Sequence, residues 1–174
     1  MHKRAGYLLI LFSVISFNSL SSEKILKDYL SDYYQLGTGK LSIFFIDIYD
    51  ISLFSQTKDY LKDKPFAIVI NYLRDLKSYQ IVDRSIDEIK RMSSASRDEL
   101  ENYRSIFTSL FPNIYSGDQL IGIRTANNDG VFFHNKKPIG KINDEKLVDS
   151  FFDIWLSDET SNPELREKLL MSYE

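Results

Sequence analysis

Two long runs of β-branched and aromatic residues constrain this fold more than any other feature of the sequence. The first, Lys40 to Phe54 (KLSIFFIDIYDISLF), contains neither glycine nor proline and predicts one long strand, or two strands joined by a bulge near Asp47–Asp50. The second, Phe66 to Leu73, is apolar on both faces as far as Asn71, which is typical of a strand buried on both sides. A chain with two such runs needs a sheet and other elements to cover it.

Helical patterns surround these runs. The spacing of apolar residues predicts a helix over Ser22 to Gln35, which the Gly37-Thr38-Gly39 stretch is expected to end. Strands separated by runs of helices, without strict alternation of the two, favour an α+β fold. The remaining predicted elements are helices around Val82–Met92 and behind the Ser96/Glu99 capping box, strands at Gln119–Thr125, Val131–His134 and Ile139–Ile142, and helices begun near Asn143 and Pro163.

The first residues have the pattern of a secretory signal peptide. A basic start at Lys3-Arg4 is followed by thirteen mostly apolar residues, Ala5 to Phe17, and then by small polar residues around Ser21. We therefore expect residues 1–21 to be cleaved after Ser21, leaving one domain over residues 22–174 in a bacterial periplasm. The alternative is an uncleaved N-terminal anchor. In the cleaved form, contact with a membrane is expected only through the signal peptide before its removal.

The composition excludes several classes of function. Twenty-two basic and 25 acidic residues give a net charge of -3, so a nucleic-acid partner is not expected. The chain has no cysteine and only two histidines, His2 and His134, which excludes zinc–thiolate sites and thiol nucleophiles. We expect no metal ion and no cofactor. For His134, at the end of a strand, a structural hydrogen bond is the simpler interpretation.

Two polar features lie within or after the apolar strands. Asp47 interrupts the first run, and a buried carboxylate there would mark a site, whereas pairing with a nearby Lys or Arg would be structural. Asn71 to Asp75 forms a polar cluster at the end of the second strand, where pocket residues or structural ion pairs both occur. Trp155 lies on an apolar helix stripe and is interpreted as a core residue.

The chain also contains many aromatic residues. Aromatic residues make up 14% of the sequence, and ten of them fall on predicted core elements, where they could line an apolar cavity or fill a core. The sequence leaves both possibilities open. Those residues are Phe44, Phe45, Tyr49, Phe54, Phe66, Tyr72, Phe132, Phe133, Phe151 and Phe152.

Several motifs, in order, resemble those of bacterial exported chalcone isomerase-like proteins. Gly37 to Phe54 is similar to a G-x-G turn followed by a strand ending in V-Y-D-A-x-L, and Pro65 to Asp75 resembles the next strand with its Y-x-R-D ending. Further similar segments are Leu110–Asp118, Phe132–Asn135, Gly140, Phe151–Leu156 and Leu165–Leu170. The resemblance covers about residues 37 to 170, nearly the whole mature chain.

The resemblance implies an open-faced β-sandwich of chalcone isomerase type, a curved antiparallel sheet covered on one face by helices with a ligand cleft between them. It does not carry catalysis over. The isomerases resemble one another in an Arg and a Thr on the early strand, where this chain offers Lys40, Ser42 and Phe44. The Tyr of the family is matched by Tyr49. Flavonoid cyclisation is therefore not expected, and other members of the superfamily bind fatty acids.

Three functions follow as hypotheses. The first is a non-catalytic protein that binds an apolar or amphipathic small molecule such as a fatty acid or an aromatic compound, with Lys40, Tyr49, Tyr72 and Arg74 as candidate ligand-binding residues. The second is an isomerase or intramolecular lyase with other groups, for which Asp47 or Tyr49 would titrate in the cleft. The third is an interaction protein whose Phe44, Phe132 and Phe151 fill the core. The oligomeric state is left open.

Overall fold

The computed structural model describes residues 17–171, with side chains from residue 22 onward. The predicted signal peptide thus lies mostly outside the described residues, and the expected cleavage site after Ser21 falls within the first helix. The described elements are α1 (Phe17–Leu30), β1 (Tyr34–Ile43), β2 (Ile46–Ser55), β3 (Phe66–Tyr72), α2 (Ser78–Met92), α3 (Arg97–Leu110), β4 (Gln119–Arg124), β5 (Gly130–His134), β6 (Lys137–Ile142), α4 (Glu145–Leu156) and α5 (Pro163–Leu170).

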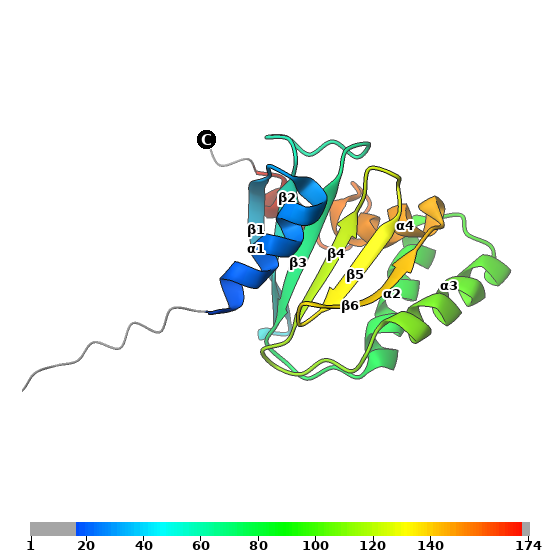
Figure 1. The fold of residues 1–174 in the computed structure, drawn as a ribbon. Helices are drawn as coiled ribbons and strands as arrows, with labels where there is room; N and C mark the ends of the chain where they lie inside the picture. Colours follow the sequence, from blue (N-terminus) through cyan, green and yellow to red (C-terminus); the bar gives the residue numbers. More distant parts are fainter. Residues whose placement is uncertain (1–16, 172–174) are drawn as a thin grey trace, which may run out of the picture.

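The strands form one antiparallel sheet in which neighbours in sequence are neighbours in space, in the order β1-β2-β3-β4-β5-β6. The sheet twists visibly in Figure 1, with α1 lying across one face and the helices α2, α3 and α4 on the other. This confirms the predicted open curved sheet with helices. The structure adds α1 on the second face, a position that the sequence did not predict.

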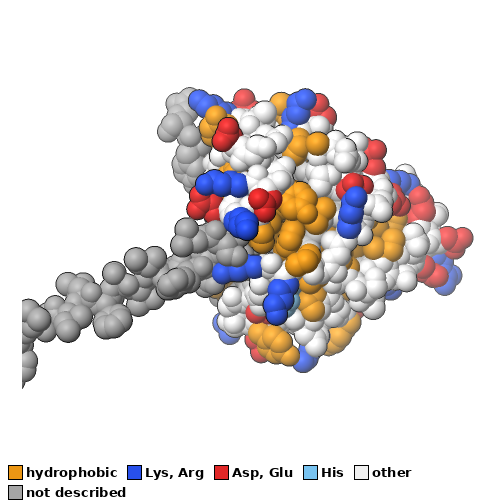
Figure 2. Space-filling model, viewed as in Figure 1, with side chains coloured by type: hydrophobic (Ala, Val, Ile, Leu, Met, Phe, Trp, Pro, Cys, Tyr) orange, Lys and Arg blue, Asp and Glu red, His pale blue; other side chains and the backbone are white. Residues whose placement is uncertain are grey.

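The sheet separates two apolar clusters, as alternation along the strands requires. Along β3, Phe66, Ile68 and Ile70 face the larger cluster beneath α2–α5, while Ala67 and Val69 face α1. On α1, Leu26 and Leu30 are buried against that second face. Figure 2, which views this face, shows hydrophobic side chains gathered next to the N-terminal segment. The larger cluster, beneath α2–α5, is the main core.

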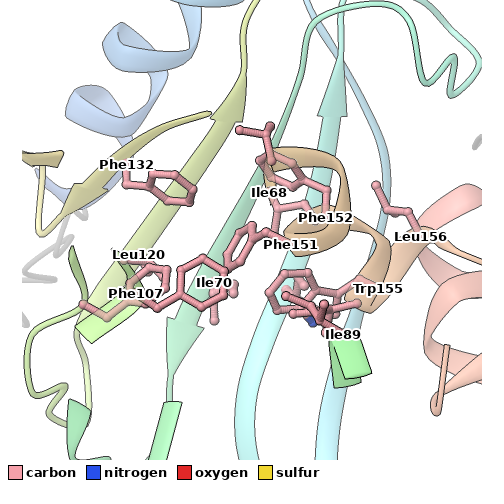
Figure 3. Packing of buried hydrophobic residues seen from close by; sticks show 14 of the residues in the cluster. Ile68, Ile70, Ile89, Phe107, Leu120, Phe132, Phe151, Phe152, Trp155 and Leu156 are labelled. Atoms are coloured by element: carbon pink, nitrogen blue, oxygen red, sulfur yellow. The ribbon is translucent and has the colours of Figure 1, made fainter. Parts of the chain in front are cut away.

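The main core is built around the aromatic side chains of α4. The ring of Phe151 lies 5.2 Å from those of Phe132 and Phe152 and 5.3 Å from that of Trp155, all edge to face (Figure 3). Such pairs add about 0.5–1.5 kcal/mol each beyond the area they bury. The contact between Phe132 and Phe151 fixes α4 against β5.

The N-terminal helix is shorter than predicted. It ends at Leu30 instead of Gln35, and Gly37 and Gly39 lie inside β1 instead of ending a helix. The reason is tertiary. Helix α5 crosses β1 so closely that a Cβ at Gly37 would collide with the backbone carbonyl oxygens of Lys168 and Leu169. The glycines permit helix–strand contact, and the pairing of β1 with β2 replaces the helical turn.

The long run from Lys40 to Phe54 forms two strands that are joined by a turn and not by a bulge, since Ile43 pairs with Ile46 and leaves Phe44 and Phe45 as a two-residue turn. A bulge is nevertheless present within the predicted Asp47–Asp50 stretch. Leu41 pairs with Tyr49 and Ser42 with Asp47, which leaves Ile48 as the extra residue of β2. Phe44 and Phe45 are 91% and 104% exposed, so their predicted place in the core is wrong.

Other local predictions are confirmed. The Ser96 hydroxyl accepts a hydrogen bond from the Glu99 amide, and the Glu99 carboxylate accepts one from the Ser96 amide. Lys146 also pairs with Glu99, and these hydrogen bonds lower the pKa of Glu99 to about 2. Within residues 17–171, the helices are all too short or too polar to cross a membrane.

Candidate functional site

An apolar cavity of about 240 Å³ lies between the sheet and the helices that cover its larger core. Strands β1–β3 form one wall, and α2 and α4 form the other. The third hypothesis required that Phe44, Phe132 and Phe151 fill this space, and the structure shows instead that a cavity remains. The lining residues are Leu41, Ile43, Ile48, Tyr49, Ile70, Tyr72, Leu76, Gln80, Ile81, Arg84, Ser85, Glu88, Phe111, Leu120, Phe151, Ile154, Trp155 and Asn162.

Two tyrosines bring polar groups into this mostly apolar wall. Tyr49 on β2 and Tyr72 on β3 are paired across the strands, and their rings meet edge to face with centroids 5.7 Å apart. The alternation of each strand points both side chains to the core face. The sequence predicted both residues as ligand-binding candidates, and the structure brings them together.

The two hydroxyls differ in their partners. The Tyr49 hydroxyl accepts a hydrogen bond of 2.9 Å from the indole nitrogen of Trp155, so this tryptophan is both a core residue and part of the cavity wall. Tyr72 is only 4% exposed, and no hydrogen bond joins its hydroxyl to the described residues. Among those residues the buried side-chain atom without a partner is Arg124 Nη1, so the Tyr72 hydroxyl is accessible from the cavity and can bond a polar ligand atom there.

Both tyrosines are neutral hydrogen-bonding groups at physiological pH. Burial raises the pKa of Tyr49 to about 12, although the hydrogen bond from Trp155 acts in the opposite direction. Burial also raises the pKa of Tyr72, and the neighbouring Tyr49 adds to that effect. A phenol in this state donates a proton to a hydrogen bond and is a poor general base at neutral pH.

Helix α2 supplies the charged part of the wall. Glu88 is 4% exposed at its side chain, and its carboxylate contacts Arg84 at 2.6 Å and Arg91 at 2.9 Å. It also accepts a hydrogen bond of 2.7 Å from the Ser161 hydroxyl. Burial raises the pKa of Glu88, but the bonds from Ser161 and the two arginines outweigh it and the net pKa is lowered. Glu88 thus remains ionised and holds Arg84 at the cavity.

Sequence reasoning missed Arg84 and Glu88. Their i, i+4 spacing was visible in the sequence, but such pairs are usual on solvated helix faces. Only the packing of α2 against the segment before α5 buries Glu88, and no local pattern reports that contact. Arg84 is therefore a cation on the cavity wall that does not come from the early strand.

The other two candidate residues lie outside the cavity. Lys40 lines an adjacent hollow that shares Leu41 and Asn162 with the cavity, and its ammonium group contacts Asp47 at 2.7 Å. Arg74 is exposed beyond the end of β3 and does not line the cavity. The structure therefore joins Tyr49 and Tyr72 and separates them from Lys40 and Arg74.

Asp47 has the structural role that was the alternative at the sequence level. Its carboxylate accepts hydrogen bonds from Lys40 and from the Ser42 hydroxyl, both 2.7 Å, and these bonds lower its pKa. His134 likewise makes a structural contact, with its Nε2 2.9 Å from an Asp118 oxygen. Among residues 17–171, no group of three His, Cys, Asp or Glu residues is arranged to hold a metal ion.

Comparisons with known proteins agree with this architecture. The model of the chalcone isomerase-like family matches residues 32–171. The crystal structure of a fatty-acid-binding protein from Arabidopsis thaliana superposes with a TM-score of 0.65, at 15% sequence identity, over 79% of this chain and 86% of that chain. At this identity the likeness establishes the fold alone. A comparison with curated protein sequences finds no match.

Proposed function

Since the chain belongs to the chalcone isomerase-like family, we propose that it is a non-catalytic binding protein for a fatty acid or a similar amphipathic molecule, exported to the periplasm. The observation that carries the proposal is the apolar cavity with Tyr72 on its wall, where a ligand can reach the hydroxyl. Apolar walls with a few polar groups are typical of small-molecule sites. The similar fold of a fatty-acid-binding protein supports the ligand class.

The arrangement suggests how an amphipathic ligand would lie. Its chain would pack against Ile70, Phe151 and Ile154, and its polar end would reach the Tyr72 hydroxyl and the Arg84 guanidinium. At about 240 Å³ the cavity is smaller than the range of about 300–1,000 Å³ usual for drug-sized ligands. We therefore expect a chain of moderate length to bind better than a long one.

An isomerase remains the alternative function. It would need an ionisable group that titrates near neutral pH within the cavity. Asp47 lies outside the cavity, and the raised pKa of Tyr49 keeps that hydroxyl protonated. These observations favour binding over proton-transfer chemistry.

Native mass spectrometry of the purified protein with octanoate, dodecanoate or palmitate tests the proposal. We expect one bound ligand, lost on denaturation, with octanoate or dodecanoate bound more tightly than palmitate. Tyr72→Phe should weaken binding by about tenfold or more, since a hydrogen bond to a charged group contributes about 1.5–3 kcal/mol. An unchanged apo mass with these acids and with flavonoids would contradict it.

Tyr103→Phe is the matched control. Tyr103 is also a buried tyrosine, 2% exposed, in the same core cluster, but it does not line the cavity. Its replacement should leave ligand affinity unchanged. Equal losses in both variants would assign the effect to core packing.

The export proposal has its own test. The full chain is expressed in a bacterium, and the mass of the protein in the periplasmic fraction is measured. A mass beginning at Ser22 supports cleavage after Ser21, whereas a chain retained in the membrane with its first residues intact would support an anchor.

A further inference from the structure

Four consecutive large apolar residues are exposed where β1 turns into β2. Ile43 and Ile46 are 45% and 49% exposed, and Phe44 and Phe45 between them are 91% and 104% exposed. We name residues 43–46 the hairpin tip. The two phenylalanine rings project into solvent at the end of the hairpin, where they bury almost nothing in the fold.

The turn is also an unfavourable place for phenylalanine. Phe44 and Phe45 have φ angles of 48° and 67°, the left-handed values of a two-residue type I′ turn. Asparagine and glycine adopt these angles with little strain, whereas bulky side chains rarely do. The aromatic pair thus neither packs in the core nor relieves the turn, and its contribution must lie outside folding.

The hairpin tip is continuous with the mouth of the cavity. Ile43 belongs to the tip and also lines the cavity, together with its neighbours Leu41 and Ile48 on the same two strands. A surface that covered the tip would therefore also lie at the edge of the cavity opening.

The size and shape of the tip favour a lipid bilayer over a protein partner. Two phenylalanine side chains offer about 400 Å² of surface. A stable protein interface buries about 800 Å² on each partner. A bilayer needs no complementary surface, and aromatic side chains are enriched where proteins meet the membrane–water boundary.

The surroundings of the tip agree with this occupant. Lys40 is held by Asp47 at 2.7 Å and by Asp50 at 3.9 Å, so the ammonium group next to the tip is neutralised within the hairpin. Two other exposed aromatic residues, Tyr79 and Tyr115, lie on segments that follow β3 and precede β4, at the same end of the sheet as the tip. Figure 2 shows hydrophobic side chains at this end of the sheet, which is the lower end in that view.

We propose that the hairpin tip inserts Phe44 and Phe45 into the interfacial layer of a lipid bilayer and holds the cavity mouth against it. An amphipathic ligand could then pass between the bilayer and the cavity without crossing water. Insertion stands on the tip alone, whereas ligand transfer rests on the function proposed above. Attachment depends on apolar insertion, because the hairpin beside the tip carries one ammonium group, Lys40, against two carboxylates, Asp47 and Asp50.

Co-sedimentation with phosphatidylcholine vesicles tests insertion. The double variant Phe44→Asn/Phe45→Gly removes both rings while supplying the residues that the turn geometry prefers, so it should fold at least as well as the wild type. Loss of two buried phenylalanines should weaken partitioning by about tenfold or more. Phe44→Trp/Phe45→Trp should retain binding. All variants share one N-terminus, verified by mass, which cancels any contribution from the first residues.

Several results would overturn the inference. One is equal partitioning of the wild type and the Phe44→Asn/Phe45→Gly variant, and another is the absence of wild-type binding to phosphatidylcholine vesicles with and without added phosphatidylglycerol. A third is a self-association, seen by analytical ultracentrifugation, that the variant abolishes without any vesicle binding.

The two proposals fail separately. The tip variant should bind octanoate in solution like the wild type, since neither phenylalanine lines the cavity. The Tyr72→Phe variant should bind vesicles like the wild type and octanoate more weakly. Failure of ligand binding with vesicle binding intact would refute only the cavity proposal.

Discussion

Two hairpins at the same end of the sheet use the same backbone turn with opposite chemistry. The β5–β6 hairpin turns at Asn135 and Lys136, with φ angles of 46° and 71°, and the β1–β2 hairpin turns at Phe44 and Phe45, with φ angles of 48° and 67°. The geometry is thus nearly identical. The two turns differ in whether their side chains make contacts that stabilise the fold.

In the polar turn the side chain is part of a network. The Asn135 amide nitrogen donates to an Asp118 oxygen at 2.7 Å, and its amide oxygen accepts from the Gln119 backbone at 2.8 Å. Asp118 also accepts from the Tyr115 backbone at 2.9 Å and contacts His134. This turn ties β5–β6 to the segment before β4, and its sequence is explained by folding.

In the aromatic turn no such contacts exist among the described residues, and both rings lie in solvent. Left-handed backbone costs a residue with a side chain about 1–2 kcal/mol. A residue that opposes the local backbone geometry and makes no packing contacts in return points to a role beyond stability.

The largest effect is expected where the polar turn is cut from its network. Asp118→Ala removes the acceptor of three hydrogen bonds from a side chain that is 16% exposed, and should lower the free energy of unfolding by about 3 kcal/mol. Urea denaturation measures this. Asp158→Ala, at an 89% exposed carboxylate, is the control and should change little. A similar small change for Asp118→Ala would refute the network.

The second prediction concerns a variant in which the two residues of the polar turn are replaced by phenylalanine. Asn135→Phe/Lys136→Phe keeps the turn but loses both hydrogen bonds of Asn135 and places two bulky residues at left-handed angles, so we expect a loss of about 2 kcal/mol. The same urea titration measures it. An unchanged stability would mean that this turn tolerates any residue, and the exposed phenylalanines would then need no separate explanation.

The sequence predicts regular elements well because their signals are local. The apolar run from Phe66 to Leu73 forms the buried strand β3, the capping box at Ser96 begins α3, and the polar Ala126–Gly130 connection lies between β4 and β5. The ordered motifs also led to the correct family and fold. These signals depend on the spacing of apolar, polar and turn-forming residues along the chain, which is present in the sequence before any tertiary contact forms.

The remaining features depend on tertiary packing, which no local pattern encodes. The run around Phe44 contains no residue that favours a turn, so a hairpin there could be recognised only from the pairing of Ile43 with Ile46. Gly37 was predicted to end a helix, because glycine often does so. Its actual role is to leave room for α5, and the sequence around Gly37 does not show that long-range contact. Tyr49 and Tyr72 could be predicted as cavity residues, because their positions on the strands follow from the local sequence. Arg84 could not be predicted, because its place at the cavity depends on how α2 packs.

The third prediction concerns the aromatic turn itself. Phe44→Asn/Phe45→Gly should raise the free energy of unfolding by about 1 kcal/mol, because both residues adopt left-handed angles with less strain. Thermal and urea unfolding measure it without vesicles. Destabilisation would show that the rings contribute to the fold after all and would weaken the case for an external role.

The smallest effect is a difference in acid sensitivity between the two turns. Burial raises the pKa of Asp118, but hydrogen bonds from Asn135, Tyr115 and His134 outweigh it, so the net pKa is lowered. A carboxyl with a lower pKa when folded stabilises the protein above its unfolded pKa of about 3.9, and this contribution disappears as the pH falls through the folded value.

The stability advantage of the wild type over Asp118→Asn should therefore shrink between pH 6 and pH 3. The stability difference between the wild type and Phe44→Asn/Phe45→Gly should stay constant, because that substitution removes no titrating group. Urea titrations at both pH values measure the two differences. An advantage over Asp118→Asn that grows in acid would reverse the sign and show that the carboxylate is not held ionised by its network.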